Sequence, residues 1–289
     1  MSSQGIKGRL SSWSFRRQLG KTLLHILLLA LVVMFMTPLV WMISTSLKKN
    51  GEVFITPIQW LPSDPQWQNY REIFEILPLT SFIKNTVYVT ILATLGNTIS
   101  SLIVAYSLSR LRWKGHETVF AVLMATMMLP GIVVLVPQFI MFFHVGWMDT
   151  FYPLIVPNWF GNSFYIFMLR QFMRGLPLEL DEAARIDGAN SFRILWQLIF
   201  PACKPAVTAV MIFAGMFHYN NFMGPLLYLS SNEKFTLPLG LYWYQGRYGN
   251  FWHLVMAAST VSVVPLIVLF FTAQRHFVQG FTFSGMGGR

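Results

Sequence analysis

Hydrophobic stretches without charged residues alternate with shorter polar segments along the chain. A bilayer core of about 30 Å needs roughly 20 apolar residues in a helix that rises about 1.5 Å per residue. Stretches of this length fit helices and not the short strands of a membrane barrel. The pattern therefore predicts an all-α integral membrane protein with about six transmembrane helices. The predicted spans are residues 23–43, 87–108, 119–143, 152–169, 206–227 and 252–273.

The composition agrees with a chain that lies mostly in lipid. Of the 289 residues, 54% are hydrophobic and 11% are charged, and the mean hydropathy is +0.52, whereas an average soluble domain is about a quarter charged. Basic residues precede the first span, as they do in a secretory signal peptide. Its apolar run is too long for such a peptide, however, and lacks an obvious small-residue cleavage site. We therefore expect residues 23–43 to be a retained membrane anchor.

The formal net charge of +10 is explained by where the basic residues lie. Fifteen of the 21 Lys and Arg residues fall in the N-terminal segment, the second-to-third connection, the fourth-to-fifth connection and the C-terminal segment. Positive residues of membrane proteins accumulate in cytoplasmic segments. The distribution predicts a multi-pass membrane protein with both termini in the cytoplasm, and no nucleic-acid partner is needed to explain the charge.

These spans divide the chain into five parts. Two prolines, Pro130 and Pro137, fall inside the third span and predict a bent helix that lines a cavity. The expected parts are a cytoplasmic N-terminal segment 1–22, a first transmembrane helix 23–43, an extracytoplasmic loop 44–84 with a short amphipathic helix at 70–76, a five-helix core 85–275 that includes a cytoplasmic loop 175–204, and a cytoplasmic tail 276–289.

The loop 175–204 is too polar in its first half to span a membrane, and it predicts a helix, a turn and a second helix. Pro177 suits a first turn, Glu179 and Asp181 suit the positive end of a helix dipole, and Gly188 suits a left-handed stop. The first helix should have about three turns. Asn190 or Ser191 can cap the second helix. Its apolar face is predicted to be Phe192, Leu195, Trp196 and Ile199, and it ends at Pro201.

The spacing in this loop is also that of a known signature: Glu-Ala-Ala, three residues, Gly, nine residues, Ile, one residue, Leu-Pro. Leu198 and Phe200 stand in place of the isoleucine and the leucine, and both exchanges are apolar. A Glu-Ala-Ala triplet alone occurs by chance in many helices, but the spaced glycine and proline favour the signature. The matching residues are Glu182, Ala183, Ala184, Gly188 and Pro201.

On these residues the chain resembles the permease subunits of ATP-binding-cassette (ABC) importers, the binding-protein-dependent transport system inner-membrane components. The string DEAARIDGA, the two prolines of the third span and the segment around residues 274–280 are similar to the carbohydrate, maltose-type branch. The resemblance covers nearly the whole chain. It implies a type I ABC importer permease fold. It also implies that the protein translocates an oligosaccharide or sugar derivative by alternating access.

The resemblance further implies partners and a coupling site. The partners would be a second homologous permease, two ATPase subunits that hold ATP and Mg, and an extracytoplasmic solute-binding protein, while this chain would bind no cofactor. The loop would be a coupling helix seated in a cleft of an ATPase subunit. The implied coupling residues are Glu182, Ala183, Ala184, Arg185, Asp187, Gly188 and Pro201.

The chain offers no source of energy or catalysis of its own. A phosphate-binding loop needs a glycine five positions before Gly-Lys-Thr, but Phe15 stands there before Gly20, Lys21 and Thr22. The main alternative is an ion-coupled secondary transporter, which usually keeps ionisable residues inside the bilayer. None of the eleven acidic residues falls at a predicted mid-membrane position. The six histidines lack metal-ligand spacing, and the single cysteine, Cys203, suits packing.

Polar and aromatic residues inside the spans indicate a candidate substrate path. Buried amides in a membrane either face a cavity or join packed helices. The interior amides are Asn85, Asn97, Gln138, Asn158, Asn162, Asn220 and Asn221. The fifth span combines aromatic faces with hydrogen-bonding groups, as sugars require, at Phe213, Phe217, His218, Tyr219, Asn221 and Phe222.

The segment 230–250 is predicted to be an extracytoplasmic loop rich in aromatic residues. Exposed aromatic side chains often anchor protein contacts, and the resemblance implies that the solute-binding protein is the partner. An aromatic belt at the lipid boundary is the alternative. The candidate contacts are Tyr242, Trp243, Tyr244 and Gln245.

Overall fold

The computed structural model describes residues 4–248 and 251–284, and these residues form helices and connections without any strand. The chain divides into two compact units. The first unit comprises Met1–Ile73 and Gly249–Thr260, and the second comprises Phe74–Tyr248 and Val261–Arg289. The all-α prediction is confirmed for the described residues.

The first unit consists of one long helix and the folded segment that follows it. Helix α1 (Gln4–Ser46) contains the first predicted span, and a short helix, η1 (Asn50–Glu52), comes after it. The Asn69 side-chain amide donates hydrogen bonds to the carbonyls of Ser46 and Lys48, at 2.9 and 3.0 Å. Lys48 is itself buried, with its ammonium 4.1 Å from the centroid of the Trp41 ring. The segment after α1 is therefore tied to the end of that helix.

Helix α2 (Gln68–Ile76) confirms the predicted short helix near residues 70–76, and it buries Asn69 and Ile73. The long helix α3 (Leu79–Arg110) belongs to the second unit and begins well before the predicted start at residue 87. Asn85 explains part of this extension, because its amide donates to the carbonyls of Glu233 and Phe235 at 2.8 and 3.0 Å. This asparagine joins elements of the protein and does not face a cavity.

The third and fourth predicted spans are interrupted. Helices α4 (His116–Thr126) and α5 (Gly131–His144) meet at a bend of 96°, with Pro130 at the break and Pro137 inside α5. The fourth span contains α6 (Tyr152–Ile155), η2 (Val156–Phe160) and α7 (Ser163–Arg174). The continuous helix predicted for 152–169 is wrong, because Gly161 takes a φ of +90° and Asn162 starts a new helix by accepting hydrogen bonds from backbone amides.

The fifth predicted span, 206–227, ends earlier than expected. Helix α11 (Lys204–Tyr219) is followed by a break and by the short α12 (Met223–Tyr228). The segment 230–250 contains η4 (Asn232–Lys234) and α13 (Leu237–Tyr248), so it is largely helical where a loop was predicted. Helix α14 (Trp252–Ser284) contains the sixth predicted span and continues into the predicted tail, of which residues 285–289 lie outside the described residues.

Length and composition are compatible with membrane spans in several of these helices. Among the described residues, Gly20–Ser46 and Leu79–Arg110 are each long and apolar enough to cross a membrane, and two bent pairs raise the number to four if each pair is one span. One pair is α4 with α5, and the other joins Ser191–Ala202 to α11 at 82°. Trp252–Val268 is apolar but shorter.

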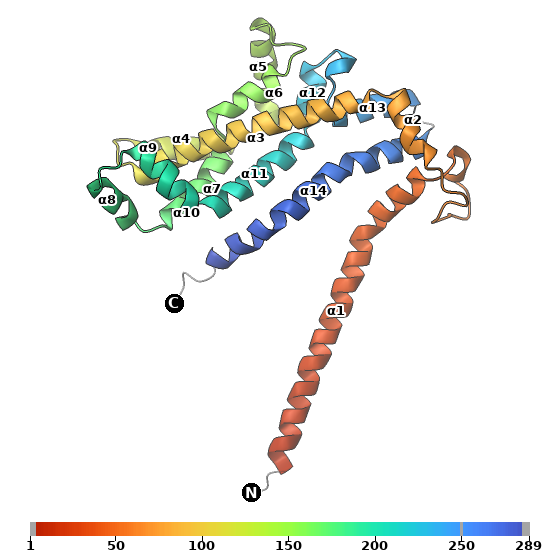
Figure 1. Cartoon of the computed structure of the whole chain (residues 1–289), viewed down its shortest axis with the longest axis horizontal. Helices are drawn as coiled ribbons and strands as arrows, with labels where there is room; N and C mark the ends of the chain where they lie inside the picture. Colours follow the sequence, from red (N-terminus) through yellow and green to blue (C-terminus); the bar gives the residue numbers. More distant parts are fainter. Residues whose placement is uncertain (1–3, 249–250, 285–289) are drawn as a thin grey trace. The chain divides into compact units, whose positions relative to one another are not determined.

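The core of the second unit lies near the Arg110 end of α3. In Figure 1, α3 extends along this unit with α8 (Glu179–Ile186) and α9 (Ser191–Ile194) near one end and α13 toward the other. Helix α3 packs most extensively against α7 and α11. Their buried side chains, with Ile194, Leu195, Ile199 and Cys203, form one hydrophobic cluster. The second half of the loop 175–204 is therefore packed into this cluster.

Candidate functional site

The loop 175–204, called the coupling loop after its predicted role, folds as a helix, a turn and a second helical segment. Helix α8 begins at Glu179 and has eight residues, so it is shorter than the three turns that we expected. Gly188 takes a φ of +79°, which confirms the left-handed stop. The Asn190 side chain caps α9 by accepting a hydrogen bond from the Arg193 amide at 2.8 Å. Local signals in the sequence thus describe the loop well.

The apolar face of the second helix differs from the prediction. A π-helical turn, η3 (Leu195–Ile199), follows α9 and leads into α10 (Phe200–Ala202). Ile194, Leu195 and Ile199 are buried in the hydrophobic cluster, but Phe192 is 70% exposed. The predicted apolar face is thus divided, because Leu195 and Ile199 pack inside the unit whereas Phe192 stays on its surface. Pro201, at the start of α10, is exposed.

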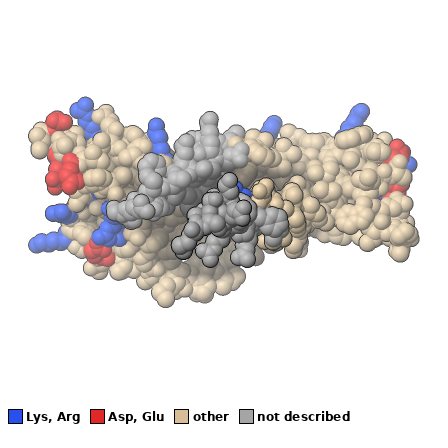
Figure 2. All heavy atoms as spheres, turned by 90° about the horizontal axis from the view of Figure 1, so that it is seen from below, with Lys and Arg blue, Asp and Glu red and all other residues tan. Residues whose placement is uncertain are grey.

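The outer surface of the loop combines charges with exposed apolar side chains. Ile186 is 86% exposed at the end of α8, the largest exposed fraction among the bulky apolar side chains that the structure describes. Around it, Glu182, Ala183, Arg185, Asp187 and Gly188 are exposed, and Ala184 is partly buried. Figure 2 shows acidic and basic side chains gathered at the end of the second unit that holds α8, beside a broad uncharged surface. This surface has the composition of a contact site.

A buried ion pair holds the inner side of α8. The Arg110 Nη1 atom lies 3.1 Å from Asp181 Oδ2, and the two side chains are only 1% and 5% exposed. Arg110 also donates hydrogen bonds to the carbonyls of Met173, Leu176 and Pro177, at 2.6, 3.0 and 3.3 Å. Burial raises the pKa of Asp181, although the Arg110 guanidinium acts in the opposite direction. Sequence analysis missed this pair, since the two residues are far apart in the chain.

A second buried arginine stabilises the same end of the unit. Arg170 of α7 donates through Nη2 to both carboxylate oxygens of Glu117, at 2.7 and 2.8 Å. Its Nε donates to the Leu108 carbonyl, and its guanidinium carbon lies 3.7 Å from the centroid of the Phe120 ring. The pair therefore joins α3, α4 and α7.

A polar cavity of about 440 Å³ lies beside the Arg110–Asp181 pair. Its wall includes Arg112, Glu182 and Arg185 in addition to the pair. Among the described residues, neither Asp181 oxygen accepts a hydrogen bond with good geometry, and the Arg110 Nε has no partner. A polar space of this size has room for water. The ion pair is thus enclosed by protein on one side and open to the cavity on the other.

A second cavity, of about 260 Å³, brings together part of the predicted substrate path. Phe217, His218 and Asn221 line it, as do Gln138 of α5 and Asn158 of η2. The Asn97 amide of α3 lies 3.0 Å from His218 Nε2 and donates to Asn158 Oδ1 at 3.2 Å. Helix α5 lines this cavity with Gly131, Leu135 and Gln138, in agreement with the cavity predicted at the bent third span.

The other residues of the predicted path are placed elsewhere. Tyr219 is buried and donates to the Ser262 carbonyl at 2.8 Å, and the Phe222 ring lies 5.0 Å from that of Tyr242. Phe213 is 43% exposed and is not among the cavity residues. Two of the remaining interior amides bond within their own helices or caps, namely Asn162 at the start of α7 and Asn220 to the Met216 carbonyl.

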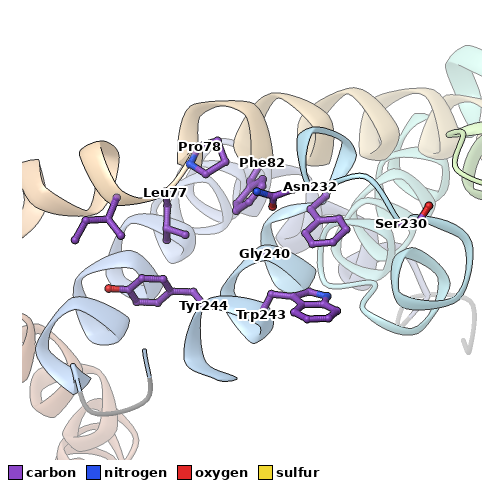
Figure 3. A pocket seen from close by; sticks show the side chains of 10 residues that line it. Leu77, Pro78, Phe82, Ser230, Asn232, Gly240, Trp243 and Tyr244 are labelled. Atoms are coloured by element: carbon purple, nitrogen blue, oxygen red, sulfur yellow. The ribbon is translucent and has the colours of Figure 1, made fainter. Parts of the chain in front are cut away.

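A third pocket, of about 350 Å³, lies near the Leu79 end of α3. Figure 3 shows Phe82 of α3 with Trp243 and Tyr244 of α13 around it. Tyr244 is only 2% exposed, so its side chain is not available for an external contact. Tyr242, Trp243 and Gln245 are exposed, and Trp243 stacks on Phe235 with ring centroids 6.1 Å apart. Of the four predicted contact residues, these three therefore lie on the surface of α13.

No group of three or more His, Cys, Asp or Glu side chains that could hold a metal ion occurs within residues 4–248 and 251–284. The helical fold, its long apolar helices and the polar cavity within the second unit are those of a membrane permease. The chain belongs to the family of binding-protein-dependent transport system inner membrane components, whose family profile matches residues 96–283.

Similar proteins agree with this assignment. The chain is 31% identical over 270 residues to the sulfoquinovosyl glycerol transport system permease protein SmoH of Agrobacterium fabrum. The aligned residues cover 93% of this chain and 95% of that protein. It is 32% identical over 246 residues to the arabinooligosaccharides transport system permease protein AraQ of Halalkalibacterium halodurans, with 85% and 86% covered.

A solved structure shares the fold. A permease chain in the crystal structure of a bacterial ABC transporter for the acidic polysaccharide alginate matches with a TM-score of 0.79, at 22% identity, over 90% of this chain and 97% of that one. The type I importer fold is thereby confirmed. The chain is a non-enzymatic permease subunit of a multi-subunit ABC importer, the ATPase is a separate subunit, and the ion-coupled alternative is not supported.

Proposed function

We propose that this permease imports a carbohydrate, an oligosaccharide or sugar derivative, by alternating access. The complete importer would contain a second homologous permease, two ATPase subunits that bind ATP and Mg, and an extracytoplasmic solute-binding protein. The names of the two similar permeases, SmoH and AraQ, refer to the transport of a sugar derivative and of oligosaccharides, which supports this class of substrate. The excess of basic residues in the coupling loop and terminal segments supports a cytoplasmic position for the loop and both termini.

The observation that carries this proposal is the exposed apolar surface of the coupling loop. Ile186 and Phe192 are 86% and 70% exposed in a loop whose first half is too polar to span a membrane. Clustered apolar side chains with a charged rim are typical of protein contact sites. An ATPase subunit would cover Ile186 and Phe192, and the rim charges of Glu182 and Arg185 would set the orientation. Closure of the ATPase pair would then move the loop.

The substrate would pass the cavity lined by Phe217, His218 and Asn221. An aromatic face next to amide groups suits a sugar ring, because the ring can stack on the aromatic face while the amides bind its hydroxyl groups. Gln138 and Asn158 add two amides that lie in the same cavity wall. On the far side of the unit, Tyr242, Trp243 and Gln245 would contact the solute-binding protein.

The test compares two exposed isoleucines. The Ile186→Asp variant places a charge at the centre of the proposed ATPase contact, and the purified permease pair should lose most of its bound ATPase subunit. Ile58→Asp is the matched control, since Ile58 is 65% exposed in the loop predicted to be extracytoplasmic. Ile58→Asp should keep the wild-type amount of ATPase. Equal retention of the ATPase by both variants would contradict the proposed docking surface.

A further inference from the structure

Arg110 joins three segments that meet at the base of the coupling loop. It is the last residue of α3, and its guanidinium contacts Asp181 in α8. The same group donates hydrogen bonds to carbonyls at the end of α7 and in the connection to α8, at Met173, Leu176 and Pro177. One rigid, planar side chain thus fixes the position of α8 relative to α3.

The energetics of the ion pair argue against stability as its main role. Removing two charges from water is costly, and the cost is recovered only when the remaining hydrogen bonds are well satisfied. Here the Asp181 oxygens accept no hydrogen bond of good geometry and the Arg110 Nε has none. Apolar replacements of such pairs are often neutral or stabilising. The presence of this ion pair is therefore better explained by its effect on the position of α8 relative to α3 than by a gain in stability.

The pair lies on a continuous path through the second unit. Glu182 and Ile186 are exposed on α8, whereas Asp181 faces inward to Arg110. Helix α3 extends from Arg110 back to Leu79 and holds Asn97, which contacts His218 and Asn158 beside the 260 Å³ cavity. Displacement of α8 would therefore reach the cavity wall through one helix.

We propose that Arg110 and Asp181 are positioning residues that transmit movement of the coupling loop to α3 and so to the substrate cavity. This inference rests on the proposed function. Neither residue contacts nucleotide or substrate in this arrangement, and both act through α8 and α3. Without the pair, an ATPase subunit can still bind the exposed surface of α8 and hydrolyse ATP, but α3 no longer follows.

The Arg170–Glu117 pair provides a matched control. Arg170 is as well buried as Arg110, with 3% of its side chain exposed, and it too donates to a backbone carbonyl. It joins α3, α4 and α7 at the same end of the unit, and it differs from the Arg110 pair in having its ionic partner on α4 and not on α8. Variants of this pair loosen the same region and leave the proposed link intact.

The experiment uses the complete importer in proteoliposomes and measures the number of ATP molecules hydrolysed per sugar imported. The R110M/D181L variant removes both charges together, so that neither is left buried alone. We expect it to raise this number roughly three- to thirtyfold, the range for residues that carry coupling between sites. Asp181→Glu keeps the charge and should keep the number near the wild-type value, because the adjacent cavity has room for a longer side chain. R170M/E117Q should also stay near wild type.

Two results would overturn the inference. One is a wild-type number in an intact R110M/D181L importer, and the other is an equal rise in R170M/E117Q. If R110M/D181L does not assemble, Asp181→Asn is compared with Asp181→Glu, and equal coupling in these two variants also overturns it. A failure of the proposed function is distinguishable, because the wild-type importer itself would then show no ATP-dependent uptake.

Discussion

Two aspartates hold connections at opposite ends of the second unit, and their surroundings differ. Asp149, between α5 and α6, accepts hydrogen bonds from the amides of Ser230 and Ser231, at 3.0 and 2.9 Å, from the Ser231 hydroxyl and from the Lys234 ammonium. These bonds, led by that of the Ser231 hydroxyl, hold the pKa of Asp149 well below its usual range. Asp181 is more deeply buried, and burial raises its pKa although the charges of Arg110 and Arg185 act in the opposite direction.

The difference separates a stabilising carboxylate from a costly one. Asp149 is partly open to solvent, and its charge is satisfied by several donors, so folding favours the ionised form. The Asp181 oxygens accept no hydrogen bond of good geometry, and the charges of Arg110 and Arg185 offset the burial of the carboxylate only in part, which is a poor arrangement for stability. The Leu79 end of the unit is thus held by satisfied hydrogen bonds, whereas the coupling-loop end keeps a link that we attribute to force transmission.

The largest expected effect is that of Asp181→Leu alone. This change leaves the Arg110 guanidinium buried without its counter-charge and should lower the free energy of unfolding by about 3–5 kcal/mol. Adding Arg110→Met should restore most of the loss. Thermal unfolding of the purified permease in detergent measures both variants. If the double variant is as unstable as the single one, the ion pair is a net stabiliser, and the contrast between Asp149 as a stabilising carboxylate and Asp181 as a costly one is wrong.

The next effect concerns the opposite end. Asp149→Asn replaces a charged acceptor by a neutral amide and should cost roughly 1.5–3 kcal/mol, the contribution of hydrogen bonds to a charged group. The same unfolding assay applies. Asp64→Asn is the control, because Asp64 pairs with Lys49 while both side chains are mostly exposed, and little change is expected. If Asp64→Asn loses as much unfolding free energy as Asp149→Asn, the hydrogen bonds of Asp149 are no more stabilising than an exposed ion pair.

Close packing near the Leu79 end gives a comparable or smaller effect. A Cβ atom at Gly240 of α13 would lie 2.3 Å from the Phe82 ring, whereas a Cβ at Gly246 of the same helix would meet nothing within 4 Å. Gly240→Ala should therefore destabilise the permease by roughly 1–3 kcal/mol. Gly246→Ala should be neutral or slightly stabilising. Unfolding temperatures of the two variants decide whether α13 is packed on α3 as described.

The smallest effect is in the pH dependence. Because the folded pKa of Asp149 is depressed, its contribution is complete above the unfolded value of about 3.9 and is lost only as pH falls through the folded value. The difference in unfolding temperature between wild type and Asp149→Asn should stay constant from pH 7 to about pH 5. A difference that shrinks within this range would mean that the carboxylate is not held as strongly as its contacts indicate.

Local patterns in the sequence predict much of this molecule. The hydropathy pattern indicates the long helices, and Gly188 and Asn190 locate the turn and cap of the coupling loop. Hydropathy alone conceals the breaks in the fourth and fifth spans, although Pro157 and Gly161 are visible signals for the first of them.

What the sequence does not predict depends on contacts between distant residues. Arg110 and Asp181 meet only after α3, α7 and α8 have packed, and the π-helical turn that follows α9 has no local signal in the sequence. The predicted substrate path is only partly correct for the same reason. Phe217, His218 and Asn221 line one cavity, whereas Tyr219 donates a hydrogen bond to the Ser262 carbonyl.

Uptake of a radiolabelled oligosaccharide into proteoliposomes tests the central claim most directly. The liposomes would contain this permease with its partner permease and the ATPase subunits, and the solute-binding protein would be added outside. The account predicts uptake that requires ATP together with all of these subunits and that is lost in Ile186→Asp. Uptake by the permease alone, without ATP and driven by an ion gradient, would contradict it.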